Sequence, residues 1–147
     1  MKNFVVILLY FFTHLYSFSS PLKDFTIDKC KEYDIPSDIA IAIIEVEPGW
    51  QNIRGVSGDI GIFQLNPVYI SYFEKKFWNG EKKFNPWNPY HNIEVGLKYL
   101  KWLYIHFNSW EKAIMAYNIG PRAVTNNYKV HQGNRYFVKV VKVLNRL

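Results

Sequence analysis

The stretch that most constrains the fold is a short run of apolar residues that ends in two acids. Residues 39–44 are apolar at every position, and a helix that is apolar all round must be buried on every side. Glu45 and Glu47 close this run, and Pro48 and Gly49 come directly after them. Because proline and glycine end helices, the sequence predicts a buried central helix that breaks where its acids stand.

Other local signals predict a mainly α fold in a single domain. Ser37, Asn66 and Ser109 are polar residues of the kind that cap helix N-termini, and Pro67 suits a first helical turn. Apolar residues recur every three or four positions over residues 89–107, which is typical of an amphipathic helix. The predicted helices cover residues 25–33, 38–47, 67–76, 89–107, 110–119 and 134–147.

Two segments and one helix face complete the expected organisation. Residues 51–67 contain Gly55, Gly58 and Gly61, so we expect loops or a small hairpin there. Residues 77–88 are rich in proline, asparagine and tryptophan and are expected to form a loop. In the last helix we expect one face to carry the apolar residues Phe137, Val140, Val141 and Leu144.

The N-terminus has the pattern of a secretory signal peptide. Residues 4–12 form an uninterrupted apolar run after Lys2, and the small residues Ser17, Ser19 and Ser20 follow. The run is short for a membrane span. We therefore expect cleavage near Ser19, which divides the chain into a signal peptide (1–19) and an exported domain (20–147) without a transmembrane segment. A buried N-terminal helix or an uncleaved anchor is the alternative, because only one positive charge precedes the apolar run.

Charge and cysteine content limit the partners that this domain can have. Removal of Lys2 leaves 17 of the 18 basic residues against 12 acidic ones, a net charge of +5 that favours an anionic partner. No helix-turn-helix, zinc-finger or RNA-binding pattern accompanies the basic residues, so nucleic acid is not expected. Cys30 is the only cysteine and the four histidines lack ligand spacing, so we expect a buried, inert thiol and no metal.

The two acids at the end of the central helix differ in what they can do. Residues two apart on a helix point to roughly opposite sides, so Glu45 and Glu47 cannot act as a pair. Glu47 stands at the rim of a buried helix near Trp50, and desolvation there would raise its pKa and make it a general acid. From these residues alone, a solvated glutamate at a helix end is the more common arrangement.

Five sequence blocks, taken together, favour a functional role for Glu47 over that of a solvated glutamate at a helix end. They are IIEVEPGW (43–50), SGDIGIFQLNP (57–67), NPYHNIEVGLKYLKWL (88–103), AIMAYNIGPRAV (113–124) and NRYFVKVV (134–141). In this order and at this spacing the chain resembles the lytic transglycosylases of the soluble type, whose domain has the lysozyme-like fold. The resemblance covers residues 35–147, nearly the whole exported domain.

The resemblance implies roles for particular residues. Glu47 would be the single catalytic acid and base, and the Tyr117 hydroxyl would help to orient it or the substrate's acetamido group. The implied substrate-binding residues are Ser57, Phe63, Gln64, Tyr117 and Asn118. From the residues alone, Gln64 could be a turn residue, but a polar side chain between Phe63 and Leu65 with glycines nearby suits the wall of a groove. Tyr117 is equally a core aromatic and Asn118 equally a helix-end residue.

The implied function is cleavage of peptidoglycan glycan strands in the periplasm or cell envelope, without a cofactor. The glutamic acid protonates the bond between N-acetylmuramic acid and N-acetylglucosamine, and the muramyl C6 hydroxyl closes a 1,6-anhydro ring. Pro48 departs from the pattern, because a serine usually follows the catalytic glutamate. The chain's small size also resembles family members that serve a secretion, pilus or flagellar assembly.

Two alternatives stay open. Asp59 in SGDIGIFQLN would allow a hydrolytic muramidase if it faced Glu47 across the groove, although a turn aspartate bonded to its own backbone is the more common case. The second alternative is a catalytically weak module that only binds peptidoglycan within an envelope assembly, which the unusual Pro48 would favour.

Overall fold

The computed structural model describes residues 20–147, and the predicted signal peptide (1–19) and its cleavage site at Ser19 lie outside the described residues. In the described part the elements follow in the order α2 (Pro21–Glu32), α3 (Ser37–Val46), η1 (Pro67–Tyr69), α4 (Ile70–Phe77), α5 (Pro89–Phe107), α6 (Trp110–Ile119), α7 (Pro121–Thr125) and α8 (Val130–Leu144). The predicted mainly α class is confirmed. None of the helices within residues 20–147 is both long and apolar enough to cross a bilayer.

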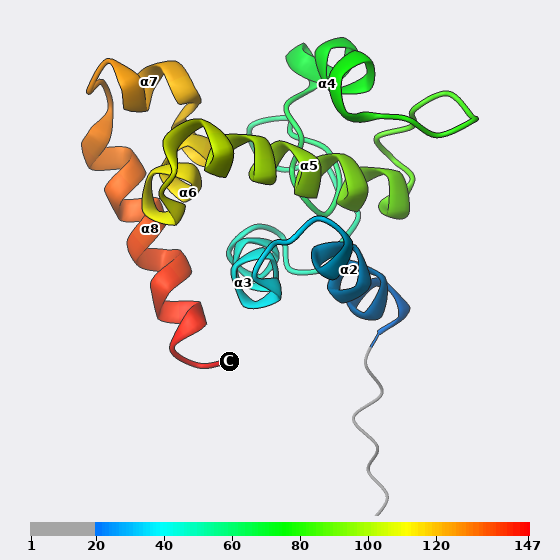
Figure 1. Cartoon of the computed structure of the whole chain (residues 1–147), viewed down its shortest axis with the longest axis horizontal. Helices are drawn as coiled ribbons and strands as arrows, with labels where there is room; N and C mark the ends of the chain where they lie inside the picture. Colours follow the sequence, from blue (N-terminus) through cyan, green and yellow to red (C-terminus); the bar gives the residue numbers. More distant parts are fainter. Residues whose placement is uncertain (1–19) are drawn as a thin grey trace, which may run out of the picture.

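The helix α3 is the buried element that the sequence predicts. No side chain from Ile39 to Ile44 is more than 9% exposed. The helix packs between α2 and α8, while α5 runs across the molecule and contacts α2, α4 and α6 (Figure 1). A helix surrounded in this way loses apolar surface to the protein on every side, which is the largest favourable contribution that such a segment can make to folding.

The helix α3 begins one residue earlier than predicted. Pro36 is its N-cap, with a φ of −58° and no side-chain cap bond, so Ser37 is the first helical residue and not the cap. The other predicted caps are correct, because Asn66 accepts from Val68 N and Ser109 accepts from Lys112 N. Asn66 caps only the short 3-10 turn η1, and α4 starts after it.

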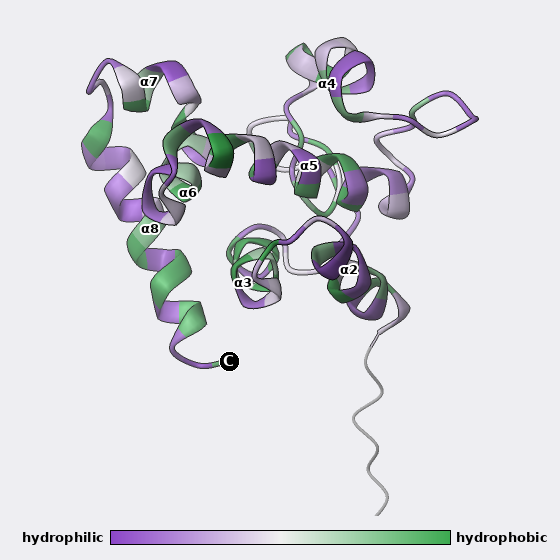
Figure 2. Ribbon diagram, in the orientation of Figure 1, coloured by the Kyte–Doolittle hydropathy of each residue, from purple (hydrophilic) through white to green (hydrophobic). Residues whose placement is uncertain are grey.

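The helix α8 also differs from the prediction. It starts at Val130, before the expected position, and the short helix α7 was not foreseen. Figure 2 shows α8 alternating between hydrophobic and hydrophilic residues along its length. Its fully buried positions are Gly133, Tyr136, Val140 and Val143. Of the predicted face, Val140 is buried, and Phe137 and Leu144 are partly buried against the core. Gly133 permits the close packing of α8 against α6, because a β-carbon there would lie 2.9 Å from Ile119 Cδ1 of α6.

The segment of residues 51–67 is a loop and not a regular hairpin. Its only bridges within the described residues are two isolated antiparallel ones, Arg54 to Ile60 and Ile60 to Leu65. Positive φ angles at Gly58, Gly61 and Gln64, of 87°, 79° and 46°, interrupt the extended backbone that a hairpin needs. The loop lies beside the C-terminal end of α3, where the predicted catalytic residue stands.

Candidate active site

Glu47 stands where α3 ends, and its carboxylate is partly withdrawn from water. It is the C-cap residue of α3 with extended backbone, at φ −76° and ψ −150°, as expected of a residue that precedes proline. Its Oε1 accepts a hydrogen bond of 2.8 Å from the Tyr136 hydroxyl. Burial raises the pKa of Glu47 above its ordinary value, the Tyr136 bond opposes this rise, and the neighbouring charge of Asp59 adds to it.

Tyr136 is the partner that sequence reasoning missed. It lies on α8, 89 residues from Glu47 along the chain, and only 7% of it is exposed. It belongs to the block NRYFVKVV, which was assigned only to a helix. Nothing in the local sequence distinguishes Tyr136 from its neighbour Phe137. The only sign of a role at the site was that the block NRYFVKVV occurs together with the Glu47 block in the family resemblance.

The two acids of α3 have separate environments, as their spacing predicts. Glu45 is exposed, and its Oε1 accepts a 2.7 Å hydrogen bond from Trp50 Nε1. Glu47 instead bonds to Tyr136. Trp50 was expected beside Glu47, but its indole nitrogen donates to Glu45. The aromatic hydrogen-bond partner of Glu47 is instead Tyr136.

A cavity of about 290 Å³ opens beside Glu47. It brings together five of the six predicted site residues with two others from the same loop: Glu47, Ser57, Gln64, Tyr117 and Asn118, with Val56 and Asp59. These residues come from the end of α3, the loop of residues 51–67 and the end of α6. The cavity therefore collects two carboxyls whose pKa burial raises, Glu47 and Asp59, and several other polar groups from segments that are distant in sequence.

Phe63 is the predicted residue that does not face this cavity. Its side chain has no exposed surface, and a β-carbon at Gly96 of α5 would collide with its ring. The expectation that its side chain contributes to a sugar site is therefore wrong. Its backbone still matters, because Asn92 accepts from its N–H at 2.8 Å and Tyr117 donates to its carbonyl at 2.7 Å.

Gln64 and Tyr117 donate hydrogen bonds to backbone carbonyls of the loop of residues 51–67. Gln64 Nε2 donates to the carbonyl oxygens of Gly61 and Ile53, at 2.7 and 3.3 Å. The Tyr117 hydroxyl donates to the Phe63 carbonyl, and the hydrogen bond to Glu47 comes from Tyr136. Both residues line the cavity, which means that the same side chains that hold the loop also present its wall to a ligand.

Asp59 faces the same cavity as Glu47. Its Oδ1 is buried and has no hydrogen-bond partner among residues 20–147, and burial raises its pKa. The interpretation of Asp59 as a turn residue bonded to its own backbone is wrong, because its backbone carbonyl accepts from Gly55 N while its buried carboxyl oxygen is left without a donor. An unpaired buried oxygen costs free energy, so this side chain is available to a ligand.

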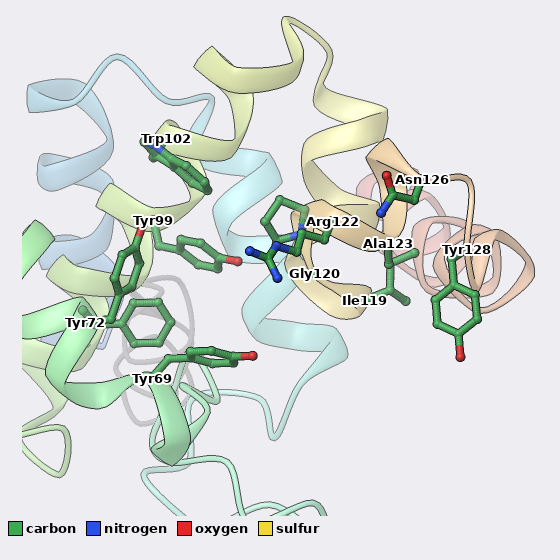
Figure 3. A pocket seen from close by; sticks show the side chains of 12 residues that line it. Tyr69, Tyr72, Tyr99, Trp102, Ile119, Gly120, Arg122, Ala123, Asn126 and Tyr128 are labelled. Atoms are coloured by element: carbon green, nitrogen blue, oxygen red, sulfur yellow. The ribbon is translucent and has the colours of Figure 1, made fainter.

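The cavity at Glu47 continues into two others. A middle cavity of about 280 Å³ shares Asp59, Gln64, Tyr117 and Asn118 with it. The middle cavity in turn meets a larger one, of about 710 Å³, that lies between α4, α5 and α7 (Figure 3). A groove made of three adjoining cavities suits a polymer better than a small ligand. Within residues 20–147 no group of three or more His, Cys, Asp or Glu residues could hold a metal ion.

Comparison with known proteins gives a family and a fold. The family model described as "Transglycosylase SLT domain" matches residues 24–138. An inactive mutant of the lytic transglycosylase Slt from Pseudomonas aeruginosa superposes with a TM-score of 0.70 and 21% identity, over 83% of this chain and 23% of that one. The 70 kDa soluble lytic transglycosylase from Escherichia coli superposes with a TM-score of 0.71 and 23% identity, over 82% of this chain and 23% of that one. The chain thus spans about a quarter of the length of each.

Proposed function

Because this chain belongs to the transglycosylase SLT domain family, we propose that it is an enzyme that cleaves the glycan strands of peptidoglycan, with Glu47 as its acid and base. One observation carries the assignment of Glu47. Its carboxyl, with a pKa raised by burial, lines the cavity that Ser57, Gln64 and Asn118 share. A raised pKa favours the protonated carboxyl, which is the form that gives a proton to a glycosidic oxygen.

The proposed reaction consumes no water. Glu47 gives its proton to the glycosidic oxygen as the bond from the muramyl C1 breaks, and the substrate's acetamido oxygen stabilises the cation that develops at C1. The C6 hydroxyl then bonds to C1 and returns its proton to Glu47, which leaves a 1,6-anhydro ring. One protein carboxyl therefore serves in both steps, unlike the two carboxyls of most glycosidases.

A second candidate is a hydrolytic muramidase that uses Asp59. The observation that favours it is the buried Asp59 oxygen without a partner, in the same cavity as Glu47. In that reaction Asp59 would bond to or stabilise the muramyl C1, and water would complete the cleavage. A third candidate is a wall-binding module without turnover, for which Pro48 is the supporting residue.

Mass spectrometry of the fragments released from purified peptidoglycan separates the three candidates. The proposed reaction yields fragments one water lighter than hydrolysis products, without a reducing end. Fragments that end in muramic acid with a free reducing end would instead support the hydrolase that uses Asp59. Binding with no fragments would leave the wall-binding module.

Glu47→Gln tests the catalytic residue. Glutamine keeps the shape and still accepts from Tyr136, but it has no proton to give, so turnover should fall roughly 10²–10⁴-fold while binding to peptidoglycan persists. Glu45→Gln is the matched control, because it makes the same change two residues earlier on the exposed side of α3 and should leave the release of fragments unchanged. Full activity in Glu47→Gln would contradict the assignment.

Export to the cell envelope is part of this proposal, because peptidoglycan lies outside the cytoplasmic membrane. The apolar run at residues 4–12 supports it as a signal peptide. A secretion, pilus or flagellar assembly is the proposed destination. Fractionation of the producing cell, followed by co-purification from the envelope fraction, tests both statements.

A further inference from the structure

The tip of the loop beside Glu47 is not held in place by apolar packing. Residues 55–59, called the loop tip below, contribute Val56, Ser57 and Asp59 to the wall of the cavity at Glu47. The Val56 side chain is fully exposed, and Ser57 is also exposed, so burial fixes neither of them. A wall that binds a ligand works best when it keeps one position, so other contacts have to order this segment.

The hydrogen bonds of the loop tip form a compact turn with one external tie from a side chain. Gly55 N donates to the Asp59 carbonyl at 2.8 Å, and Gly58 N donates to the Gly55 carbonyl at 2.9 Å. Among residues 20–147, the side chain that hydrogen-bonds to this turn is that of Arg54, whose Nη1 donates to the Gly58 carbonyl at 3.1 Å. The turn therefore depends on where the Arg54 side chain is held.

Trp87 supports the Arg54 side chain. The Arg54 guanidinium lies 5.3 Å from the centroid of the Trp87 ring, a separation at which a cation is attracted to the face of an indole. Trp87 lies between α4 and α5, and its carbonyl accepts a 2.7 Å hydrogen bond from Asn52 Nδ2. Asn52 and Arg54, two residues apart, thus both contact the same residue of a distant loop.

Trp87 is itself fixed to the body of the protein. Its backbone N–H donates to Asn85 Oδ1 at 3.0 Å. The carbonyl before it, that of Pro86, accepts a 2.9 Å hydrogen bond from the buried Asn92 of α5. A continuous series of contacts therefore runs from α5 through residues 86–87 and Arg54 to the loop tip.

We propose that Arg54 is a positioning residue: stacked on Trp87, it holds the loop tip in place beside Glu47. Its effect on cleavage rests on the proposed function, whereas its effect on the order of the loop tip does not. Arginine suits this role better than lysine, because a planar guanidinium stacks on an aromatic face and still donates hydrogen bonds from its edge.

Hydrogen exchange tests the ordering of the loop tip without any substrate. In Arg54→Gln the amides of Gly55 and Gly58 should exchange about tenfold faster, the ratio expected when one hydrogen bond and one exposed cation–π contact are lost. Trp87→Leu should give a smaller increase, and Trp87→Phe, which keeps an aromatic face, should stay closest to the unmutated protein. Arg146→Gln is the control, because it removes the same charge from an exposed position just after α8.

The pH profile of cleavage tests the effect on the active site. The charged and titratable neighbours of Glu47 are Asp59 on the loop tip and Tyr136 and Lys139 on α8. When the loop tip leaves its place, Glu47 loses the repelling charge of Asp59 and gains contact with water, and both changes lower its pKa. In Arg54→Gln the fall in kcat/KM with rising pH should therefore move to lower pH.

This direction distinguishes positioning from other effects of the substitution. Loss of the arginine charge alone would raise the pKa of Glu47 and move the fall to higher pH, and lower stability alone would not move it. We also expect KM to rise about fivefold in Arg54→Gln, because the loosened wall loses contacts worth about one hydrogen bond. Arg146→Gln should change neither KM nor the profile.

The outcomes separate this inference from the proposed function. Unchanged exchange at the loop tip in Arg54→Gln, or a pH profile that is unmoved or moves to higher pH, would overturn the inference. If Arg54→Gln does not fold, Trp87→Leu decides by the same two measurements and keeps every charge. Absence of any fragments from the unmutated protein would count against the proposed function, and hydrogen exchange would still decide whether Arg54 orders the loop tip.

Discussion

The environment of Glu47 is set by three side chains with different effects. Tyr136 donates to its carboxylate at 2.8 Å and so favours the ionised form. Asp59, a second negative charge in the same cavity, disfavours it, and Lys139 favours it to a smaller extent. Burial is the largest effect and raises the pKa. Burial therefore favours the protonated form of Glu47, Asp59 adds to this effect, and Tyr136 and Lys139 oppose it.

Two substitutions should move the pH profile of cleavage in opposite directions. A general acid must be protonated, so kcat/KM should fall as pH rises through the pKa of Glu47. Tyr136→Phe removes the bond that stabilises the carboxylate, which raises the pKa of Glu47 further and moves this fall to higher pH. Asp59→Asn removes a repelling charge, which lowers the pKa and moves the fall to lower pH.

The measurement is the initial rate of peptidoglycan cleavage as a function of pH for Tyr136→Phe, Asp59→Asn and the unmutated protein. Shifts in the same direction would contradict the roles given to the two neighbours. Asp59→Asn also discriminates between reactions, since a loss of about 100-fold at every pH would support the Asp59 hydrolase and a shifted profile with retained activity would support the single-acid reaction.

At the scale of elements, one side chain of α5 holds the groove wall in place. Asn92 is completely buried. Its Oδ1 accepts from Phe63 N at 2.8 Å, and its Nδ2 donates to the carbonyls of Ile60 and Pro86, each at 2.9 Å. Gly61 allows this approach, because a β-carbon there would collide with the Asn92 carboxamide. The loop that carries Gln64 and Asp59 is thus anchored to a helix rather than paired as a hairpin.

Asn92→Ala should destabilise the protein by about 3 kcal/mol, because it leaves the buried Phe63 N–H and the partly buried Pro86 carbonyl without partners, while the Ile60 carbonyl keeps only its bond from Leu65 N. It should also reduce cleavage more than its effect on stability predicts, since the loop then loses its anchor. Thermal unfolding and cleavage rates measure the two effects. Asn88→Ala is the control on the same helix, where loss of an N-cap that accepts from Tyr90 and His91 should cost about 1 kcal/mol. Equal losses in both variants would contradict the anchoring role.

At the scale of the whole molecule, packing has to supply the stability, because Cys30 is the only cysteine. Cys30 lies in α2 and is completely buried, as predicted. Burial, with a smaller contribution from the charge of Asp38, raises the pKa of its thiol to about 12. The thiolate is the reactive form, so the folded protein keeps this sulfur unreactive at neutral pH.

A thiol reagent should therefore modify Cys30 only when the chain unfolds. At neutral pH the labelling rate of the folded protein should be about 10³-fold or more below that of the denatured protein, since a stability of several kcal/mol keeps the unfolded fraction below that level. Labelling followed by mass spectrometry, with and without denaturant, measures the ratio. Rapid labelling of the folded protein would contradict the burial of Cys30.

The amino-acid sequence by itself determined most of the helices and the position of Glu47 at the end of α3, but not the short helix α7 or the start of α8. The helix α5 covers Pro89–Phe107, the range that its apolar periodicity predicts. Pro48 places Glu47 at the end of α3, because the residue before a proline leaves helical geometry. Tertiary structure alone decided which side chains meet. Packing of α8 against α3 brings Tyr136 to Glu47, and the anchored loop turns Phe63 into the core and Asp59 toward the groove. Helix boundaries depend on a few adjacent residues, whereas burial and hydrogen bonding at the site depend on segments up to 89 residues apart.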